Sequence, residues 1–286
     1  MALCLRSIKE NEPAEIIVVD GNSSDDTVAI AKKYTDHVIS DGGKGLGAAR
    51  RIGTEAAQNP LIAMVSPDNV MPKESLAQLA KDLEKNNWVA VEPQVRVLLD
   101  NDSTYWDRAW DYNLFLDLIP GERPVVGTPN LSRRDALLKY SYDDAAKTGE
   151  DTDICEKWRR DGLKVGCGST VAYEKQRLTF RGFRARWIWY GTGDAFFIWN
   201  WRATPRVSIR HFLHPLRTYM ILRPLEATFK GRPDVVPFLF LGGVFRYVGM
   251  FKTLPKLIRK KQSPQPPTPI LRKEDKDGVF GRELDM

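Results

Sequence analysis

The sequence predicts an α/β protein, with a Rossmann-like mixed sheet flanked by helices and a C-terminal helical appendage. Three observations predict this fold class. Short apolar strands alternate with helical segments over about the first 95 residues. Polar residues follow two of these strands directly, as they do where α/β sheets bind ligands. Beyond residue 205 the chain mixes arginine with aromatic and aliphatic residues, which suits amphipathic helices.

The first half of the chain reads as alternating helices and strands. The helix over 24–34 is indicated by Ser, Asp and Thr at its start, because these residues cap helix N-termini well. A glycine-rich turn precedes the helix over 46–58. The elements expected here are, in order, a helix end at 3–9, a strand at 15–19, a helix at 24–34, a strand at 37–40, a helix at 46–58, a strand at 61–65 and a helix at 73–85. This order is half of a nucleotide-binding sheet.

The second half contains longer and more aromatic segments. We expect a strand pair over 88–97, a helix over 105–118, a strand over 164–173, an aromatic and basic segment over 177–201, and helices from 215 onward. Residues 262–286 have four prolines and many charges, a composition that is typical of disorder. We therefore predict one domain over 1–204, a helical appendage over 205–261 and a disordered tail over 262–286.

Composition places the chain among ordinary globular proteins. Of its 286 residues, 43 are basic and 37 acidic, a net charge of +6 that favours anionic ligands or surfaces. Cys4, Cys155 and Cys167 are too few and too scattered for a disulfide framework, so a reducing compartment is expected. The N-terminus lacks the pattern of a signal peptide. The most apolar stretch, 235–251, is short and contains Arg246, so we expect a cytoplasmic protein without a spanning helix.

Two segments could hold a nucleotide. Asp20 follows the strand EIIVV, where its carboxylate could accept a hydrogen bond from a base or a ribose, but a simple turn is an equally good explanation. GGKGLGAARR could bring Lys44 and Arg50 towards phosphates. It lacks the spacing of a P-loop, so a plain glycine-rich turn remains an alternative.

Two groups of carboxylates could carry further chemistry. Asp68 follows the strand LIAMV through Ser66 and Pro67, and a single aspartate there can bind Mg²⁺ together with phosphate oxygens and water. Capping of a helix N-terminus is its alternative role. Glu150 and Asp151 lie at the start of an amphipathic helix, where acidic residues also stabilise the helix dipole. For this pair the residues alone favour the structural role narrowly over a catalytic base.

Five motifs in order resemble those of the family-2 glycosyltransferases over roughly residues 1–200. They are EIIVVDGNSSDDT, GKGLGAARRIGTEAA, SPDN, GTPNLSRRDAL and GEDTDICEKWRRDG. The resemblance implies a GT-A fold for residues 1–204. It further implies a metal-dependent hexosyltransferase that moves a sugar from a nucleoside-diphosphate sugar to a hydroxyl group of a lipid-linked or glycan acceptor, with inversion at the anomeric carbon.

The resemblance also implies roles for single residues. Asp20 would contact the nucleobase or the ribose, and Asp68 would coordinate Mg²⁺ or Mn²⁺ on the diphosphate. Asp151 would deprotonate the acceptor hydroxyl, with Glu150 beside it. The motif GTPNLSRRDAL, which includes Gly127 and Thr128, is similar to the acceptor-side loop of the family.

The run RARW, residues 184–187, is similar to an arginine-tryptophan element of the family. Within it, Arg186 is the expected contact of the diphosphate, because guanidinium groups pair with phosphate in a planar fork, and Trp187 belongs to the same element.

The chain departs from the family pattern in three places. Ser66 stands where the metal motif usually has its first aspartate. Phe183 stands where processive synthases have a glutamine, which argues against a polysaccharide synthase. The sequence begins in the helix that follows the first strand of the family, so a central position of the sheet is expected to be empty.

The appendage contains apolar segments with a basic rim, such as PLRTYMILRPLEATF, which predict peripheral association with an anionic membrane surface, at its cytoplasmic face. A helical lid packed on the first domain is the alternative. His211 and His214 have no third ligand and are expected to be structural. Two rival functions remain: a non-catalytic nucleotide-binding relative, and a nucleic-acid-binding protein using residues 177–202. The second leaves the carboxylate motifs unexplained, so no nucleic-acid partner is expected.

Overall fold

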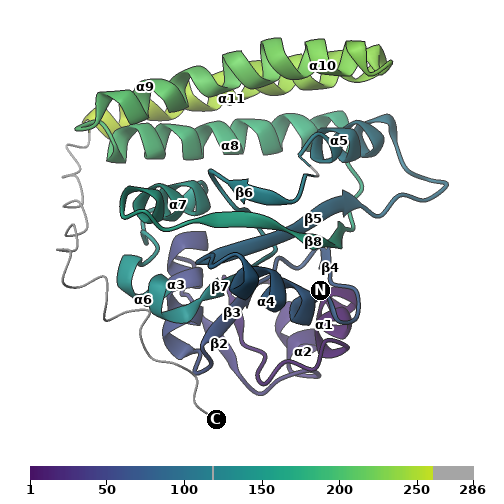
Figure 1. Cartoon of the computed structure of the whole chain (residues 1–286), viewed down its shortest axis with the longest axis vertical. Coiled ribbons are helices and arrows are strands. Elements are labelled where there is room, and N and C mark those ends of the chain that lie inside the picture. Colours follow the sequence, from purple (N-terminus) through teal and green to yellow (C-terminus); the bar gives the residue numbers. More distant parts are fainter. Residues whose placement is uncertain (118, 260–286) are drawn as a thin grey trace.

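The computed structural model describes residues 1–117 and 119–259, and it confirms the mixed α/β architecture with helices on both faces of a sheet (Figure 1). The six-stranded sheet has the order β3-β7-β5-β8-β4, with β6 also pairing with β8. Its strands are β3 (Leu61–Met64), β4 (Asn69–Val70), β5 (Ala90–Val97), β6 (Gly121–Arg123), β7 (Asn130–Arg133) and β8 (Val165–Glu174). Only the central pair β5–β8 is parallel within this described sheet.

The N-terminal elements form a separate small sheet. They are α1 (Ala2–Lys9), β1 (Val18–Asp20), α2 (Thr27–Ala31), β2 (Val38–Ser40) and α3 (Leu46–Ala56). Strands β1 and β2 pair in parallel with each other. In the part of the chain that the structure describes, β1 has no second strand neighbour, and β3 pairs only with β7. The sheet is therefore divided between β1 and β3 in the described residues.

The prediction of a strand pair over 88–97 is wrong, because this segment forms the single strand β5. Strand β5 is paired on both sides, antiparallel to β7 and parallel to β8, which leaves no room for a hairpin. Trp88 packs directly against the backbone of β8 beside it. A Cβ atom on Gly166 would lie 2.4 Å from the Trp88 ring, so only glycine fits at that position of β8.

Helices cover the two faces of the sheet. One face carries α4 (Ser75–Lys85) and α6 (Arg134–Tyr140), and the other carries α5 (Tyr105–Phe115), α7 (Glu150–Arg160) and α8 (Phe180–Asn200) (Figure 1). Helix α5 begins at a capping box, in which the Thr104 side chain and Asp107 satisfy each other's backbone N–H groups. Helix α7 has acidic residues in its first turn and basic residues in its last, which suits the helix dipole.

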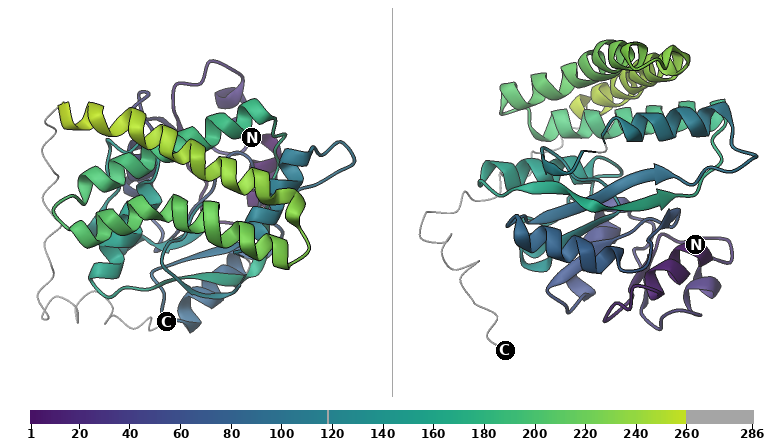
Figure 2. Two further views of the ribbon diagram at one scale, coloured as in Figure 1. Left: turned by 90° about the horizontal axis from the view of Figure 1, so that it is seen from above. Right: turned by 45° about the vertical axis from the view of Figure 1, so that its right-hand side comes forward.

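Beyond α8 the chain forms an outer layer of helices, which we define as residues 205–259. It consists of α9 (Pro205–His214), the π-helix η1 (Pro215–Leu222), α10 (Arg223–Phe229), the 3₁₀ turn η2 (Pro233–Val235) and α11 (Val236–Arg259). The expectation that these helices begin at 215 was wrong, since α9 begins ten residues earlier with proline in its first turn, where a missing N–H costs nothing. The layer lies above α8, with α11 running back beside α9 and α10 (Figures 1 and 2).

Helix α11 packs against α8 with backbone in contact with backbone. A Cβ on Gly191 of α8 would lie 2.0 Å from the carbonyl oxygen of Arg246, and one on Gly249 of α11 would lie 2.1 Å from that of Ile188. Only glycine permits this approach. This close contact between α8 and α11 therefore joins the outer layer rigidly to the rest of the protein.

The segment Pro233–Arg259 is long and apolar enough to cross a membrane, with a mean hydropathy of 1.4. We expected from the sequence that no segment is long and apolar enough to cross a membrane. That expectation was wrong, because this helix is longer than the apolar stretch 235–251 indicated. The core helix of a soluble protein is mostly buried, whereas about 39% of the most apolar window of this helix is buried inside the protein. Length and composition therefore leave both explanations open. The tail predicted over 262–286 lies outside the described residues.

Candidate active site

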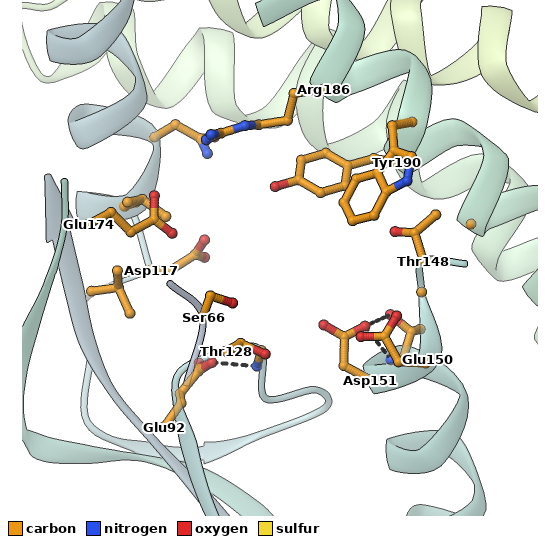
Figure 3. A pocket seen from close by; sticks show the side chains of 18 of the residues that line it. Ser66, Glu92, Asp117, Thr128, Thr148, Glu150, Asp151, Glu174, Arg186 and Tyr190 are labelled. Atoms are coloured by element: carbon orange, nitrogen blue, oxygen red, sulfur yellow. Dashed lines mark hydrogen bonds between the residues drawn. The ribbon is translucent and has the colours of Figure 1, made fainter. Parts of the chain in front are cut away.

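A cavity of about 750 Å³ lies between one face of the six-stranded sheet, the start of α7 and the helices α8 and α11 (Figure 3). Eight of the ten site residues predicted from the sequence line it. They are Arg50, Asp68, Gly127, Thr128, Glu150, Asp151, Arg186 and Trp187. Asp20 and Lys44 are not among the lining residues. The structure thus gathers the predicted base, metal and acceptor-side residues into one pocket.

The start of α7 places two neighbouring carboxylates in different surroundings. Glu150 is 3% exposed, and one of its oxygens lies 2.8 Å from Nη1 of Arg50. Burial, followed by the charge of Asp151, raises the pKa of Glu150. Asp151 accepts the backbone N–H of Thr152 with Oδ1 at 2.6 Å. Its second oxygen, Oδ2, has no hydrogen bond within the described chain and is free to accept a proton from a ligand.

Arg50 is held inside the protein by several partners. Besides Glu150, it donates a hydrogen bond to the Thr128 hydroxyl and lies 5.5 Å from the centre of the Tyr142 ring. Its contact with Glu150 is close but not aligned as a hydrogen bond. Arg50 therefore ties α3 to α7 and to the loop before β7. This pairing competes with the diphosphate contact that the sequence predicted for it.

Asp68 lies in a turn between β3 and β4. The Asn69 side chain closes this turn by accepting the Ser66 N–H at 2.9 Å, and the backbone carbonyl of Asp68 accepts the N–H of Lys175 at 2.8 Å. Because strand β4 follows directly, the alternative role of Asp68 as a helix cap is wrong. No described residue forms a hydrogen bond or an ion pair with its carboxylate.

A second carboxylate, Glu174 at the end of β8, lies beside this turn, because β4 and β8 pair through Asn69 and Glu174. It accepts the indole N–H of Trp110 at 2.9 Å. Burial, and to a smaller extent the charge of Asp68, raises the pKa of Glu174. In the described ranges no group of three or more His, Cys, Asp or Glu could hold a metal by itself. An ion at Asp68 would therefore complete its shell with phosphate oxygens and water.

Arg186 stands out among the cations of the pocket. Three of them are paired with carboxylates, namely Arg50 with Glu150, Arg123 with Glu92 and Arg246 with Asp194. Arg186 forms no ion pair with any described residue, and its guanidinium lies 5.1 Å from the centre of the Trp110 ring. Trp187, next in sequence, is 1% exposed and packs edge-on against Trp110 and Tyr219. Arg186 is thus available to a ligand, whereas Trp187 supports the wall behind it.

Asp20 ends β1 and Lys44 lies in the loop after β2, and neither is among the residues that line the pocket. Asp20 accepts the N–H of Ser23 with Oδ2 at 3.1 Å, which is the turn that the sequence left open as an alternative. Its other oxygen is buried without a hydrogen-bond partner in the described structure. Lys44 is exposed in a loop that Asp41 organises, by accepting the N–H groups of Gly43 at 2.6 Å and Gly45 at 3.2 Å.

The helices that close the pocket are joined by a buried ion pair. Asp194 of α8 accepts two hydrogen bonds from Arg246 of α11, at 2.7 and 2.5 Å, and lies 2.8 Å from Nε2 of His211. Burial alone would raise the pKa of Asp194, but Arg246 and His211 outweigh it and hold that pKa well below its usual range. Burial and the charge of Arg246 lower the pKa of His214 to about 3. This cluster fixes the outer layer to the pocket.

Sequence reasoning missed four pocket carboxylates, Glu92, Asp117, Glu174 and Asp194. Glu174 ends an apolar strand, the same signal that pointed to Asp20 and Asp68, so it could have been found. Glu92 lies inside the strand AVEPQVRV, where a carboxylate that faces solvent would look the same. Only the three-dimensional structure separates those two cases.

Comparison with known proteins identifies the class. The model of the family "Glycosyl transferase family 2" matches residues 1–141. Uncharacterized glycosyltransferases of Mycobacterium tuberculosis and Mycobacterium bovis are 35% identical over 69 residues, which are 24% of this chain and 32% of each relative. The match thus spans about a third of the length of these curated relatives. Residues 1–141 thus match glycosyl transferase family 2, as the order of the motifs predicted.

Solved structures of S. aureus TarS are also similar to this chain. The structure of TarS residues 1–349 has a TM-score of 0.46 and 13% identity, and covers 92% of this chain and 88% of its own length. The same protein in complex with UDP-GlcNAc has a TM-score of 0.45 and 14% identity, with the same coverage.

Proposed function

We propose that this protein transfers a sugar from a nucleoside-diphosphate sugar to an acceptor hydroxyl, with inversion of the anomeric carbon. One observation carries the proposal: an unpaired carboxylate oxygen of Asp151 and an unpaired guanidinium of Arg186 lie on opposite sides of the same pocket (Figure 3). A single displacement needs this arrangement, because the base and the leaving group are on opposite sides of the reacting carbon.

The proposed step is an attack by the acceptor oxygen on the anomeric carbon. Asp151 takes the proton of the hydroxyl with Oδ2 as the new carbon–oxygen bond forms. The bond between the anomeric carbon and the diphosphate oxygen breaks, and the leaving diphosphate keeps that electron pair. Arg186 lies where it can hold the negative charge that develops on the diphosphate.

We further propose that Asp68 holds Mg²⁺ or Mn²⁺. Its carboxylate has no protein partner among the described residues, and one carboxylate with phosphate oxygens is a usual donor set for Mg²⁺. Such an ion would neutralise charge on the leaving diphosphate. Glu174, next to it on the paired strand, would be its nearest acidic neighbour. Binding of nucleoside diphosphates with and without Mg²⁺, measured by calorimetry on wild type and Asp68→Asn, tests this part.

Hydrolysis of, and transfer from, a panel of nucleotide sugars tests the reaction itself. We expect Asp151→Asn to lower turnover by about 100-fold to 10,000-fold, the usual contribution of a general base. Asp102→Asn, which changes an exposed aspartate of the loop before α5, is the matched control and leaves turnover unchanged. Unchanged transfer in Asp151→Asn would remove Asp151 as the base.

The two rival functions predict different results. A non-catalytic relative would bind no nucleoside diphosphate in a metal-dependent way. A nucleic-acid-binding protein would need exposed aromatic side chains in the segment 177–202 for stacking on bases. Within that segment Phe183 and Trp187 are buried in packing, whereas Phe180 and Trp189 are 47% and 42% exposed. The pocket carboxylates, Asp68 and Asp151 among them, have no role in binding nucleic acid, and they favour the glycosyltransferase.

We also propose that the outer layer binds the cytoplasmic face of an anionic membrane, where a lipid-linked acceptor is available. Residues 205–259 contain ten Lys and Arg against two Asp and Glu, whereas residues 1–204 contain 27 against 30. The layer also exposes many large apolar side chains, namely Ile209, Leu213, Leu216, Ile221, Leu222, Leu225, Phe229, Phe240, Phe251 and Ile258. Positive charge mixed with exposed apolar groups is the composition of membrane-surface helices.

The alternative of a packed helical lid describes only the inner face of this layer. That face packs on α8, while the apolar side chains named above remain exposed. Cys4, Cys155 and Cys167 are free and buried, which suits a cytoplasmic protein. The proposed membrane would cover these exposed apolar side chains.

A further inference from the structure

The strand residue Glu92 puts a carboxyl group into the pocket that no sequence motif indicated. It lies in the middle of β5, and its side chain is 15% exposed, towards the cavity. Oε2 accepts the backbone N–H of Gly127 at 2.7 Å, and Oε1 lies 3.3 Å from Nη1 of Arg123. Burial raises the pKa of Glu92 to about 7, in spite of these two partners.

Gly127 separates Glu92 from the proposed base Asp151. A Cβ atom on Gly127 would lie 3.7 Å from Oε2 of Glu92 and 3.9 Å from Oδ2 of Asp151. Because glycine has no such atom, the two carboxyl groups flank one small space that no side chain of Gly127 fills. Both groups line the pocket, at the end away from Arg186 (Figure 3).

Two carboxyl oxygens around one space match two hydroxyl groups on neighbouring carbon atoms. A carboxyl group is a strong hydrogen-bond partner for a hydroxyl, and in a buried site each group left unmatched costs binding energy. An acceptor with a single hydroxyl would satisfy Asp151 and leave Glu92 without a ligand partner. An acceptor with two adjacent hydroxyls would satisfy both.

We propose that Glu92 holds a second hydroxyl group of the acceptor, next to the one that Asp151 deprotonates, so that the acceptor is a polyol such as a sugar ring. This inference rests on the proposed glycosyl transfer and narrows its substrate class. The competing explanation is that Glu92 only positions the loop at Gly127. A purely positioning role would affect all acceptors equally, including water.

Two small probes separate these explanations: trans-1,2-cyclohexanediol, which carries two adjacent ring hydroxyls, and cyclohexanol, which carries one. We expect the wild type to use the diol with a kcat/KM about tenfold or more above that of cyclohexanol. In Glu92→Gln, which keeps an oxygen for the Gly127 N–H, this preference falls to about threefold or less. Hydrolysis of the nucleotide sugar and transfer to cyclohexanol fall by a smaller factor than transfer to the diol does.

A second variant and a control complete the experiment. Gly127→Ala puts a methyl group at ordinary contact distance between the two carboxyls, and it abolishes the preference for the diol while Glu92 is still present. Glu122→Gln, at an exposed carboxylate of β6 that pairs with Lys164, keeps the full preference.

The outcomes separate failure of this inference from failure of the proposed function. If the wild type hydrolyses no nucleotide sugar, the proposed glycosyl transfer fails. If the wild type hydrolyses a nucleotide sugar but does not prefer the diol to cyclohexanol, the inference about Glu92 is wrong. The inference is also wrong if the wild type transfers the sugar to neither probe. It is also wrong if Glu92→Gln keeps the preference, or if it lowers hydrolysis and both transfers by the same factor.

Discussion

Two sides of the pocket use the same arrangement with opposite charges. At the start of α7, Glu150 is buried against Arg50, while the neighbouring Asp151 keeps one oxygen free. On the helices above, Arg246 is buried against Asp194, while Arg186 has no described ion-pair partner. On each side of the pocket, the charged side chain that has an ion-pair partner holds the protein together. The charged side chain without such a partner is available to a ligand.

The largest effect is expected from breaking the buried pair of the helices. Asp194→Asn leaves Arg246 charged and without its carboxylate, which should lower the free energy of unfolding by about 3–5 kcal/mol. Asp234→Asn breaks the exposed pair with Arg232 and should cost about 0–1 kcal/mol. Urea unfolding of both variants measures this, and equal losses would contradict the division between buried and exposed pairs.

The unpaired cation should behave in the opposite way. Arg186→Ala is expected to lower kcat/KM for the nucleotide sugar by about 100-fold, because a donor aimed at the leaving group is lost. Its free energy of unfolding should stay within about 0.5 kcal/mol of the wild type. Arg184→Ala, an exposed arginine of the same helix, is the control for turnover. A large loss of stability in Arg186→Ala with normal turnover would reverse the assignment.

The outer layer also contains both kinds of cation, some with an ion-pair partner and some without one. Those without an ion pair to any described residue are Arg206, Arg217, Lys252, Lys256 and Arg259. Replacing Phe229 and Phe251 together by serine should weaken binding to vesicles of phosphatidylglycerol by about tenfold or more, because exposed apolar area is lost. Flotation measures the binding.

Two controls accompany the vesicle measurement. Leu138→Ser changes an exposed apolar residue of α6, outside the layer, and should leave binding unchanged. Vesicles of neutral phosphatidylcholine should bind the wild type weakly, since the attraction to anionic lipid is electrostatic. Equal binding of all variants to both lipids would argue that the layer is only a packed lid.

The smallest effect concerns the pH dependence of stability. The pKa of Glu92 rises from 4.5 to about 7 on folding, so between these values the folded protein holds a proton that the unfolded chain has lost. Its contribution to the free energy of unfolding therefore falls as the pH rises from about 4.5 to about 7, by roughly 1–3 kcal/mol. Glu92→Gln removes this part of the decline, as urea unfolding at several pH values measures. An identical decline in both proteins would contradict the raised pKa.

Much of the fold and part of the site could be predicted from this sequence. The alternating pattern predicted β3, β8 and α7, because apolar periodicity and capping residues are local signals. Asp68, Asp151 and Arg186 were named from motif order, and the structure brings them to one pocket.

The rest depended on contacts between distant segments. The ion pair of Arg50 with Glu150 joins α3 to α7 across a hundred residues, and no local pattern indicates that it occupies the arginine. The division between β1 and β3 could not be read from local patterns either, and Asp20, at the end of β1, does not line the pocket. Glu92 could not be separated from a solvent-facing strand residue, because strand alternation does not tell which face is a cavity.

The glycine contact between α8 and α11 has a consequence for how location and chemistry are connected. Helices that touch through their backbones cannot slide past each other without a clash, so they move together as one rigid body. Arg186 is on one of these helices and the proposed membrane surface includes the other. Any tilt that a bilayer imposes on α11 would be passed to α8 and would move the Arg186 guanidinium, which is proposed to hold the diphosphate. Docking would therefore set the geometry of the donor side as well as the place where the enzyme works.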